Sequence, residues 1–314
     1  MNGRAWSNDE IFIMIYNGRH IDGMNKKARI TLLDCIIAVI IILGIVWLLY
    51  RIRHGLQYHW NWQAMPQFLF RYDDDLSKWV PNVLIKGFFA TIRLGIWSGL
   101  LAVMIGTTMA LCRTSKSLFR RMVGRAYVEL VRNTPPLVLI FIVYFFISTQ
   151  VFELVNIDEF VRGIPPGFIE LFFVPYEQFA VFLSGIITLA LYEGAYIAEI
   201  IRAGILSIDK GQWEASSALG LSWLQQMLYI IFPQATPRIL PPLAGQFIST
   251  IKDSAIVSVI SIQELTFQGM ELMASTYMTF EVWITITCLY FILTFICSLA
   301  VRRIEIVMSS SFSA

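Results

Sequence analysis

The sequence predicts an all-α membrane protein with about six transmembrane helices. Of its 314 residues, 57% are hydrophobic and only 15% are charged, a balance that is rare in soluble globular proteins. Six segments are apolar over roughly the 20 residues that a helix needs to cross a bilayer. The links between these segments differ in charge, as expected for loops on opposite sides of a membrane.

The six expected spans follow one another along the chain. They cover Leu32–Tyr50, Pro81–Cys112, Pro136–Phe152, Gln178–Arg202, Leu243–Leu265 and Glu281–Val301. The second span is longer than a bilayer requires, so it should tilt or extend into water. A cleaved signal peptide is the alternative interpretation of the first span. About thirty residues precede it and no small-x-small cleavage site follows it, so we interpret it as an uncleaved anchor.

Charge predicts the orientation of the spans, because Lys and Arg mark the cytoplasmic side. The link between spans two and three is basic, with Arg113, Lys116, Arg120, Arg121, Arg125 and Arg132. The next link is acidic, with Glu153, Asp158, Glu159, Glu170 and Glu177 against a single basic residue, Arg162. We therefore expect the first link, the loop from Ala203 to Pro242 and both termini to be cytoplasmic. Arg51 and Arg53 argue weakly against this scheme.

Several function classes lack their sequence signals. The four cysteines lie in or beside apolar segments, which favours small buried residues over disulfides or metal ligands. No histidine has a Cys or His partner at zinc spacing. No G-x-x-x-x-G-K-[ST] loop is present, so we expect no ATP binding by this chain. A membrane-bound enzyme is disfavoured because no spaced catalytic cluster is found. We expect no catalytic residues, no metal and no cofactor.

The most informative segment is Glu214–Pro233, which is polar and amphipathic in a chain that is otherwise mostly apolar. Two helix-start patterns, each a polar cap followed three residues later by Gln, lie at Asp209–Gln212 and Ser222–Gln225. Gly220 lies between them, where a helix end often needs a left-handed residue. Pro233 should stop the second helix. We expect two short helices joined at Gly220, outside the bilayer.

The same segment carries more apolar residues than a solvated loop needs: Trp213, Leu219, Leu221, Trp223, Leu224 and Met227. One interpretation is an amphipathic helix lying among lipid headgroups. The other is a docking surface for a partner protein, which we favour because of the motif that follows.

The spacing of this segment resembles the EAA loop of permease subunits from bacterial ATP-binding-cassette (ABC) importers. Glu214-Ala215-Ser216 begins it, Gly220 lies six residues after the Glu, and Ile230 to Pro233 end it. Ser216 replaces the second Ala of the motif, and Phe232 replaces its Leu. In the family this loop is the mechanical joint with the ATPase. The resemblance therefore implies ATPase-coupling roles for Glu214, Ala215, Gly220, Leu221, Trp223 and Pro233.

Three further motifs resemble the permeases of polar amino acid importers, the histidine, glutamine, glutamate and general L-amino acid group. Residues 127–135 read YVELVRNTP, residues 195–205 read AYIAEIIRAGI, and residues 252–260 read KDSAIVSVI. Together they cover roughly Lys86 to Arg303. The first eighty residues lie outside the match.

The resemblance implies a five-helix type I ABC importer core over residues 81–303, with a cytoplasmic coupling loop at 203–242 inside it. Residues 1–80 would add a cytoplasmic N-terminus, an extra transmembrane helix and an outer interfacial loop rich in Trp and Tyr. Residues 304–314 would form a C-terminal tail. The expected location is the bacterial plasma (inner) membrane.

The implied function is the permease subunit of an ATP-driven amino acid importer. The implied partners are ATPase subunits that bind ATP and Mg, a second permease that is identical or paralogous, an extracytoplasmic substrate-binding protein, and the lipid bilayer; nucleic acid is not among them. A secondary transporter or channel without an ATPase is the alternative. It would explain the spans, but it would leave the EAA-like loop without a role.

Four ionisable residues should lie at membrane depth, where charge is costly and faces a partner or water. They are Arg93, Glu193, Lys252 and Asp253. An amino acid zwitterion needs a cation for its carboxylate, for which Arg93 is a candidate, and an anion for its ammonium, for which Glu193 or Asp253 is a candidate. The alternative is internal pairing of Arg93 with Glu193 and of Lys252 with Asp253.

Two glutamate–arginine pairs have helical i, i+3 spacing. Glu199 and Arg202 lie at the cytoplasmic end of span four, where we expect a local ion pair. Glu129 and Arg132 have the same spacing, just before Pro135. Since proline disfavours a regular helix there, we expect a bend at the cytoplasmic gate.

Overall fold

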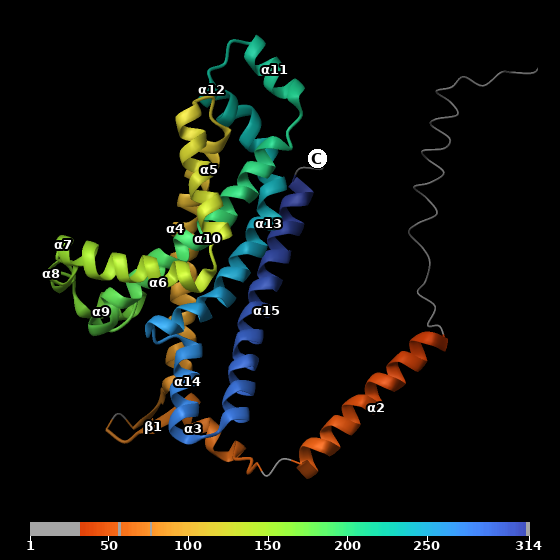
Figure 1. Ribbon diagram of the computed structural model, residues 1–314, viewed down its shortest axis with the longest axis vertical. Helices are drawn as coiled ribbons and strands as arrows, with labels where there is room; N and C mark the ends of the chain where they lie inside the picture. The colour runs from red at the N-terminus through yellow and green to blue at the C-terminus, as the bar shows by residue number, and fades with distance from the viewer. Residues whose placement is uncertain (1–31, 56–57, 76, 312–314) are drawn as a thin grey trace, which may run out of the picture. The chain divides into compact units, whose positions relative to one another are not determined.

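The computed structural model describes residues 32–55, 58–75 and 77–311 (Figure 1). It divides into two units, Met1–His59 and Trp60–Ala314. The one helix described in the first unit is α2 (Leu32–Gly55), and its apolar residues from Leu32 to Trp47 are exposed. The predicted first span therefore forms a helix. Its apolar stretch, Leu32–Trp47, is shorter than that of the other candidate spans, and the predicted cytoplasmic N-terminus lies outside the described residues.

Two long helices form the centre of the second unit. They are α4 (Val83–Thr114) and α10 (Phe179–Leu206), which pack along one another (Figure 1). Their backbones approach closely at Gly106, where an added Cβ would lie 2.5 Å from Cγ2 of Ile197. Small residues allow such contacts between apolar helices. The central pair matches the predicted spans two and four.

The chain between these helices bends sharply. Helix α5 (Leu118–Asn133) packs on α4 and α10, and α6 (Pro136–Phe146) then leaves at 117°. Pro135, whose backbone is extended, makes the predicted bend. A π-helical turn and short helices follow: Ile147–Val151, α7 (Phe152–Val155), α8 (Ile157–Arg162), α9 (Pro166–Phe172) and the 3₁₀ turn Tyr176–Gln178.

The predicted bounds of span five, and the predicted stop at Pro233, are wrong. From Trp223 to Ile260 the described chain is helical without a break, through α12 (Trp223–Gln225), a π-helical turn (Gln226–Ile231), α13 (Phe232–Asp253) and a 3₁₀ turn (Ser254–Ile260). Pro233 lies in the first turn of α13, directly after the π turn. A π turn changes the hydrogen-bond pattern locally, so a proline there does not end the helix.

The remaining elements begin at the end of the second unit opposite α11 (Lys210–Ala218), and the last helix runs from there back toward the α11 end (Figure 1). Helix α14 (Leu265–Thr276) leads to the long α15 (Thr279–Ser311). After His59 come a 3₁₀ turn, one short helix and an antiparallel hairpin: Trp62–Ala64, α3 (Met65–Leu69), β1 (Phe70–Asp73) and β2 (Lys78–Pro81). This hairpin is a small departure from the predicted all-α fold.

By length and composition, four helices of the described chain are candidate spans: 83–114, 176–206, 223–260 and 279–303. The bent pair α5–α6 makes a fifth if it counts as one span. The fold is thus an all-α membrane architecture of four to five candidate spans plus the N-terminal apolar helix.

A buried glutamate joins three of these helices. Glu264 caps α14 by accepting a hydrogen bond from the amide of Phe267 at 2.8 Å. Its other oxygen accepts from the hydroxyls of Tyr290 on α15, at 2.7 Å, and Thr91 on α4, at 3.3 Å. Burial raises the pKa of the Glu264 carboxyl, because the surrounding protein solvates its charge less well than water does.

Replacing Glu264 with alanine should lower the free energy of unfolding by about 3 kcal/mol, since it removes a helix cap and leaves buried donors unpaired. Thermal unfolding in detergent measures this loss. The matched control is Glu271→Ala, on the exposed face of the same helix. An equal melting temperature for the two variants would contradict the prediction.

Candidate docking turn and buried polar cluster

The two predicted helix starts are confirmed, but only the first helix is short, because the second continues to Ile260. Helix α11 begins at Asp209, whose side chain accepts a hydrogen bond from the amide of Gly211 at 2.7 Å. Helix α12 begins at Ser222, which forms a reciprocal capping box with Gln225. Gly220 joins them with φ +75°, a conformation in which other residues are strained. The capping patterns and the glycine therefore play the roles that the sequence predicted. We call residues 209–224 the docking turn.

Hydrogen bonds and apolar contacts hold the docking turn to the helix bundle. The side-chain Nε2 of Gln226 donates to Oγ of Ser217 at 3.0 Å and to the carbonyl of Leu221 at 2.9 Å. Trp213 and Trp223 are half-buried and pack on a cluster of buried residues from α4, α10 and α13. The turn is thus attached to the bundle along its inner side.

Only part of the predicted apolar docking surface is exposed. Met227 is 1% exposed and belongs to the core, so its predicted place on that surface is wrong. It lies three residues after the docking turn and faces the interior of the bundle. Leu219 is 78% exposed and Leu224 59%. Glu214 and Ala215 are also exposed. Leu219 lies outside every candidate span of the described chain, so its exposure is not that of a membrane-spanning segment.

The other two residues assigned to ATPase coupling lie nearby. Leu221 is half-buried, and its carbonyl is the acceptor for Gln226. Pro233 is exposed and directly precedes Gln234, whose Nε2 donates to Oε1 of Gln212 on α11 at 3.2 Å. Both residues shape the base of the docking turn.

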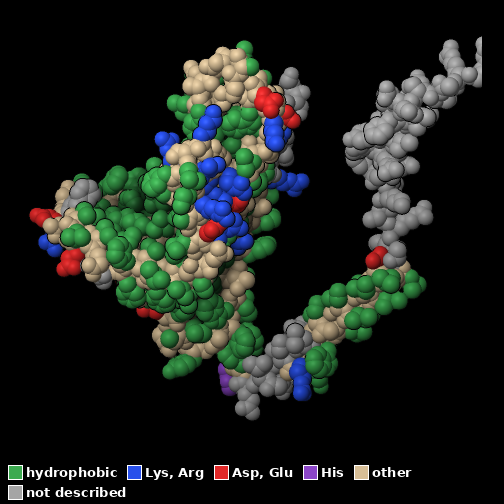
Figure 2. All heavy atoms as spheres, turned by 45° about the horizontal axis from the view of Figure 1, so that its top comes forward, with side chains coloured by type: hydrophobic (Ala, Val, Ile, Leu, Met, Phe, Trp, Pro, Cys, Tyr) green, Lys and Arg blue, Asp and Glu red, His purple; other side chains and the backbone are tan. Residues whose placement is uncertain are grey.

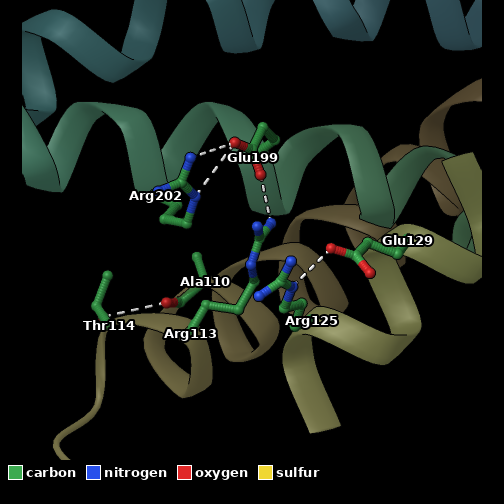
Figure 3. A network of polar contacts seen from close by, with 7 residues as sticks. All are labelled: Ala110, Arg113, Thr114, Arg125, Glu129, Glu199 and Arg202. Atoms are coloured by element: carbon green, nitrogen blue, oxygen red, sulfur yellow. Dashed lines mark hydrogen bonds and ion pairs between the residues drawn. The ribbon is translucent and has the colours of Figure 1, made fainter. Parts of the chain in front are cut away.

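Basic side chains surround the end of the bundle beneath the docking turn. Figure 2 shows Lys and Arg gathered there. One carboxylate joins two helices: Glu199 of α10 pairs through one oxygen with Arg202 of the same helix and through the other with Arg113 of α4 (Figure 3). The expected Glu199–Arg202 pair is confirmed, and Arg113 is an additional partner that the sequence did not suggest.

The second glutamate–arginine pair does not form. Glu129 instead pairs with Arg125, one turn earlier, with Nε and Oε1 at 2.6 Å (Figure 3). The guanidinium of Arg132 lies over the ring of Tyr196 on α10, 5.4 Å from its centroid. An i, i+4 neighbour competes with an i, i+3 neighbour for the same carboxylate, and the aromatic face offers Arg132 a cation–π contact.

Neither internal pairing proposed for the membrane-depth charges is present. Nη1 of Arg93 donates to the carbonyl of Phe173 at 2.6 Å. Beside it, Trp97 stacks on Phe173 with centroids 5.0 Å apart. Arg93 thus holds the link after α9 against α4. Lys252 is exposed, and the ion pairs among the described residues do not include it.

Glu193 instead lies in a buried polar cluster, which we define as Glu193, Gln246, Thr250 and Asp253. Glu193 is fully buried, and its Oε2 accepts from Nε2 of Gln246 at 2.6 Å. Its Oε1 is buried and has no hydrogen-bond partner within the described structure. Asp253 and Thr250 of α13 are close enough to interact with the same carboxyl.

Gln246 is the residue that sequence reasoning missed. A signal was present: Gln246, Thr250 and Asp253 are spaced four and three apart, so they share one face of a helix. A carboxyl with a free oxygen, an amide and a second carboxyl on facing helices can receive a cationic group such as an ammonium.

Comparisons with known proteins agree with this architecture. Residues 102–306 match the family described as the inner membrane component of binding-protein-dependent transport systems. The chain is 31% identical over 252 residues to the glutamine transport system permease protein GlnP of Escherichia coli K12, covering 80% of this chain and 97% of that protein. It is 34% identical over 232 residues to the putative GlnP of Rickettsia typhi, covering 73% and 95%.

Solved structures give the same result. The crystal structure of an amino acid ABC transporter with histidines has a TM-score of 0.60 and 31% identity, covering 79% of this chain and 99% of that one. An inward-facing structure of the MetNI methionine ABC transporter has a TM-score of 0.52 at 20% identity, which shows likeness of fold alone. The resemblance predicted from the motifs is confirmed: the chain belongs to the family of binding-protein-dependent transport system inner membrane components, as a permease rather than a catalytic subunit.

Proposed function

We propose that this chain forms the translocation path of an ATP-driven importer of polar amino acids, and that the docking turn binds the ATPase subunit. The observation that carries the proposal is the exposed tip of the turn, with Leu219 projecting from a rigid base outside the candidate spans. Large apolar side chains that are exposed together mark candidate interaction sites, and both Leu219 and Leu224 are exposed on this turn. Glu214 and Ala215 lie exposed on the same turn, and Gly220 sets its shape.

The same arrangement supports a proposed orientation of the chain. The docking turn and the basic helix α5 lie at one end of the molecule (Figure 1), and basic residues favour the cytoplasmic side. We place this end and both termini in the cytoplasm, where ATPase subunits that carry ATP and Mg are available. A second permease subunit, identical or paralogous, and an extracytoplasmic binding protein complete the proposed complex.

The buried polar cluster is the proposed substrate path. Glu193 and Asp253 would receive the ammonium group of the amino acid, with Gln246 as an additional polar contact. Lys252 is the better candidate for the carboxylate, because Arg93 is engaged with the carbonyl of Phe173. Relatives named as glutamine permeases make L-glutamine the first substrate to test.

The proposal is tested by uptake into proteoliposomes that contain the complex, purified with its candidate ATPase. The binding protein is added outside, ATP is enclosed in the lumen, and the probes are radiolabelled L-glutamine, L-glutamate, L-histidine and L-arginine. We expect uptake of at least one of them that requires lumenal ATP and survives collapse of ion gradients. Uptake driven by an ion gradient without ATP would support the secondary transporter instead.

Glu214→Ala should reduce coupled ATP hydrolysis and uptake by about tenfold, because an exposed charged contact at a protein interface is worth on the order of 1–2 kcal/mol. The binding-protein-stimulated ATPase rate measures the effect. Glu271→Ala, an exposed glutamate at the other end of the molecule, is the control. Equal rates for both variants would remove Glu214 from the interface.

A further inference from the structure

A second polar feature lies between the buried polar cluster and the docking-turn end of the molecule. A cavity of about 470 Å³ opens between α5, α10 and α13 and is lined mainly by Arg132, Tyr196, Glu199, Ser207, Arg238 and Gln246. Gln246 belongs to both features, because its side chain lines the cavity and also donates to Glu193. Gln246 therefore links the wall of the cavity to the buried polar cluster.

The cavity wall carries positive charge that no carboxylate of the described chain neutralises. Arg132 lies over the Tyr196 ring, and Arg238 donates to the carbonyl and hydroxyl of Ser207, the latter at 3.0 Å. Neither arginine takes part in the ion pairs of the described residues. The carboxylate on the wall, Glu199, is already engaged by two arginines.

The cavity wall thus carries guanidinium groups, whereas the buried polar cluster carries two carboxyl groups, those of Glu193 and Asp253. Guanidinium groups bind carboxylates and phosphates through charge-assisted hydrogen bonds. A cavity of this volume also exceeds the space that a single amino acid needs. The remaining wall, formed by Ile200, Ala203, Gly204 and Pro242, is apolar or small and leaves room for a side chain.

We propose that this cavity is a second amino acid subsite, on the cytoplasmic side, in which Arg132 and Arg238 bind the carboxylate of the substrate. The inference rests on the proposed function. A phospholipid phosphate offers similar chemistry. We favour the carboxylate of an amino acid because Gln246, which lines the cavity, also donates a hydrogen bond to Glu193 of the buried polar cluster. An amino acid leaving Glu193 by its ammonium end would meet the two arginines with its carboxylate.

Occupancy of this subsite from the cytoplasm should slow uptake, because a cavity open to one side must close before the path opens to the other. The experiment uses the proteoliposomes described above, with the best-transported amino acid of the panel added to the lumen at increasing concentration. The half-inhibitory lumenal concentration is measured for the wild type, for the double variant Arg132→Gln and Arg238→Gln, and for Arg125→Gln.

We expect the half-inhibitory concentration to rise about tenfold in the double variant, each variant being compared with its own uninhibited rate. Arg125→Gln is the matched control, since Arg125 lies on α5 like Arg132, is exposed and does not line the cavity. In the wild type, the α-amide of the same amino acid, which lacks the carboxylate, should inhibit about tenfold more weakly than the free acid.

Three results would overturn the inference alone: no lumenal inhibition in the wild type, the same half-inhibitory concentration in the double variant, or equal inhibition by acid and amide. Vesicles with and without phosphatidylglycerol provide a further arm. A variant effect seen only when this lipid is present would assign the cavity to a phospholipid phosphate and also overturn the inference. Absence of any wild-type uptake would instead overturn the proposed function, and the inference with it.

Discussion

Leu219→Asp should separate the chain from its ATPase and abolish ATP-driven uptake. Leu219 is 78% exposed at the tip of a turn whose base is fixed by Gln226. Burying an aspartate without a partner at an interface costs several kcal/mol, and each 1.4 kcal/mol weakens binding tenfold. Co-purification with the tagged ATPase in detergent, together with uptake in proteoliposomes, measures the loss.

The folded state of this variant should be unchanged, because the leucine makes little contact with its own chain. Thermal unfolding checks this point. Leu154→Asp is the control for co-purification, since Leu154 is 82% exposed but lies on α7, away from the docking turn (Figure 1). Retention of the ATPase by Leu219→Asp would place the interface elsewhere.

Glu193→Gln should raise the substrate concentration needed for half-maximal uptake by about 10- to 100-fold. The change keeps the size of the side chain but removes the carboxyl group with which an ammonium would pair. A hydrogen bond that involves a charged group contributes about 1.5–3 kcal/mol, which corresponds to that range at tenfold per 1.4 kcal/mol. Uptake is measured as a function of the concentration of loaded binding protein and of free amino acid.

Association with the ATPase should be the same for Glu193→Gln and the wild type, because Glu193 is remote from the docking turn. Glu281→Gln is the matched control: Glu281 is another fully buried glutamate, and it accepts a hydrogen bond from the amide of Asn61 at 2.6 Å. Unchanged uptake kinetics in Glu193→Gln, or an equal defect in Glu281→Gln, would argue that Glu193 serves only to hold helices together.

The docking turn could be predicted because its signals are local. A cap residue bonds to an amide two or three positions away, and Gly220 needs only its own backbone angle. The long apolar runs of α4 and α10 predicted helices for the same reason. Each of these features depends on neighbouring residues rather than on the partner that the fold brings close.

The side-chain partners could not be predicted because they lie far apart in sequence. Arg93 binds a carbonyl 80 residues away, and Arg113 reaches Glu199 across 86 residues. Pro233 was misjudged for a different reason. The rule that proline ends a helix assumes the regular α pattern, and the π turn before Pro233 departs from that pattern.

The unbroken helical course from Trp223 to Ile260 has a mechanical consequence. Its N-terminal end belongs to the docking turn, and Gln246 and Asp253 lie on its later turns, on the order of 30 Å away at about 1.5 Å per residue. If the ATPase subunit rotates α12, the movement would be transmitted along a continuous helix to Asp253, with no loop between them, and from there to its neighbour Glu193. Pro237, Pro241 and Pro242 each remove a backbone hydrogen bond between the two points. Bending of this helical segment should therefore concentrate at residues 233–242, between the docking turn and the proposed substrate site.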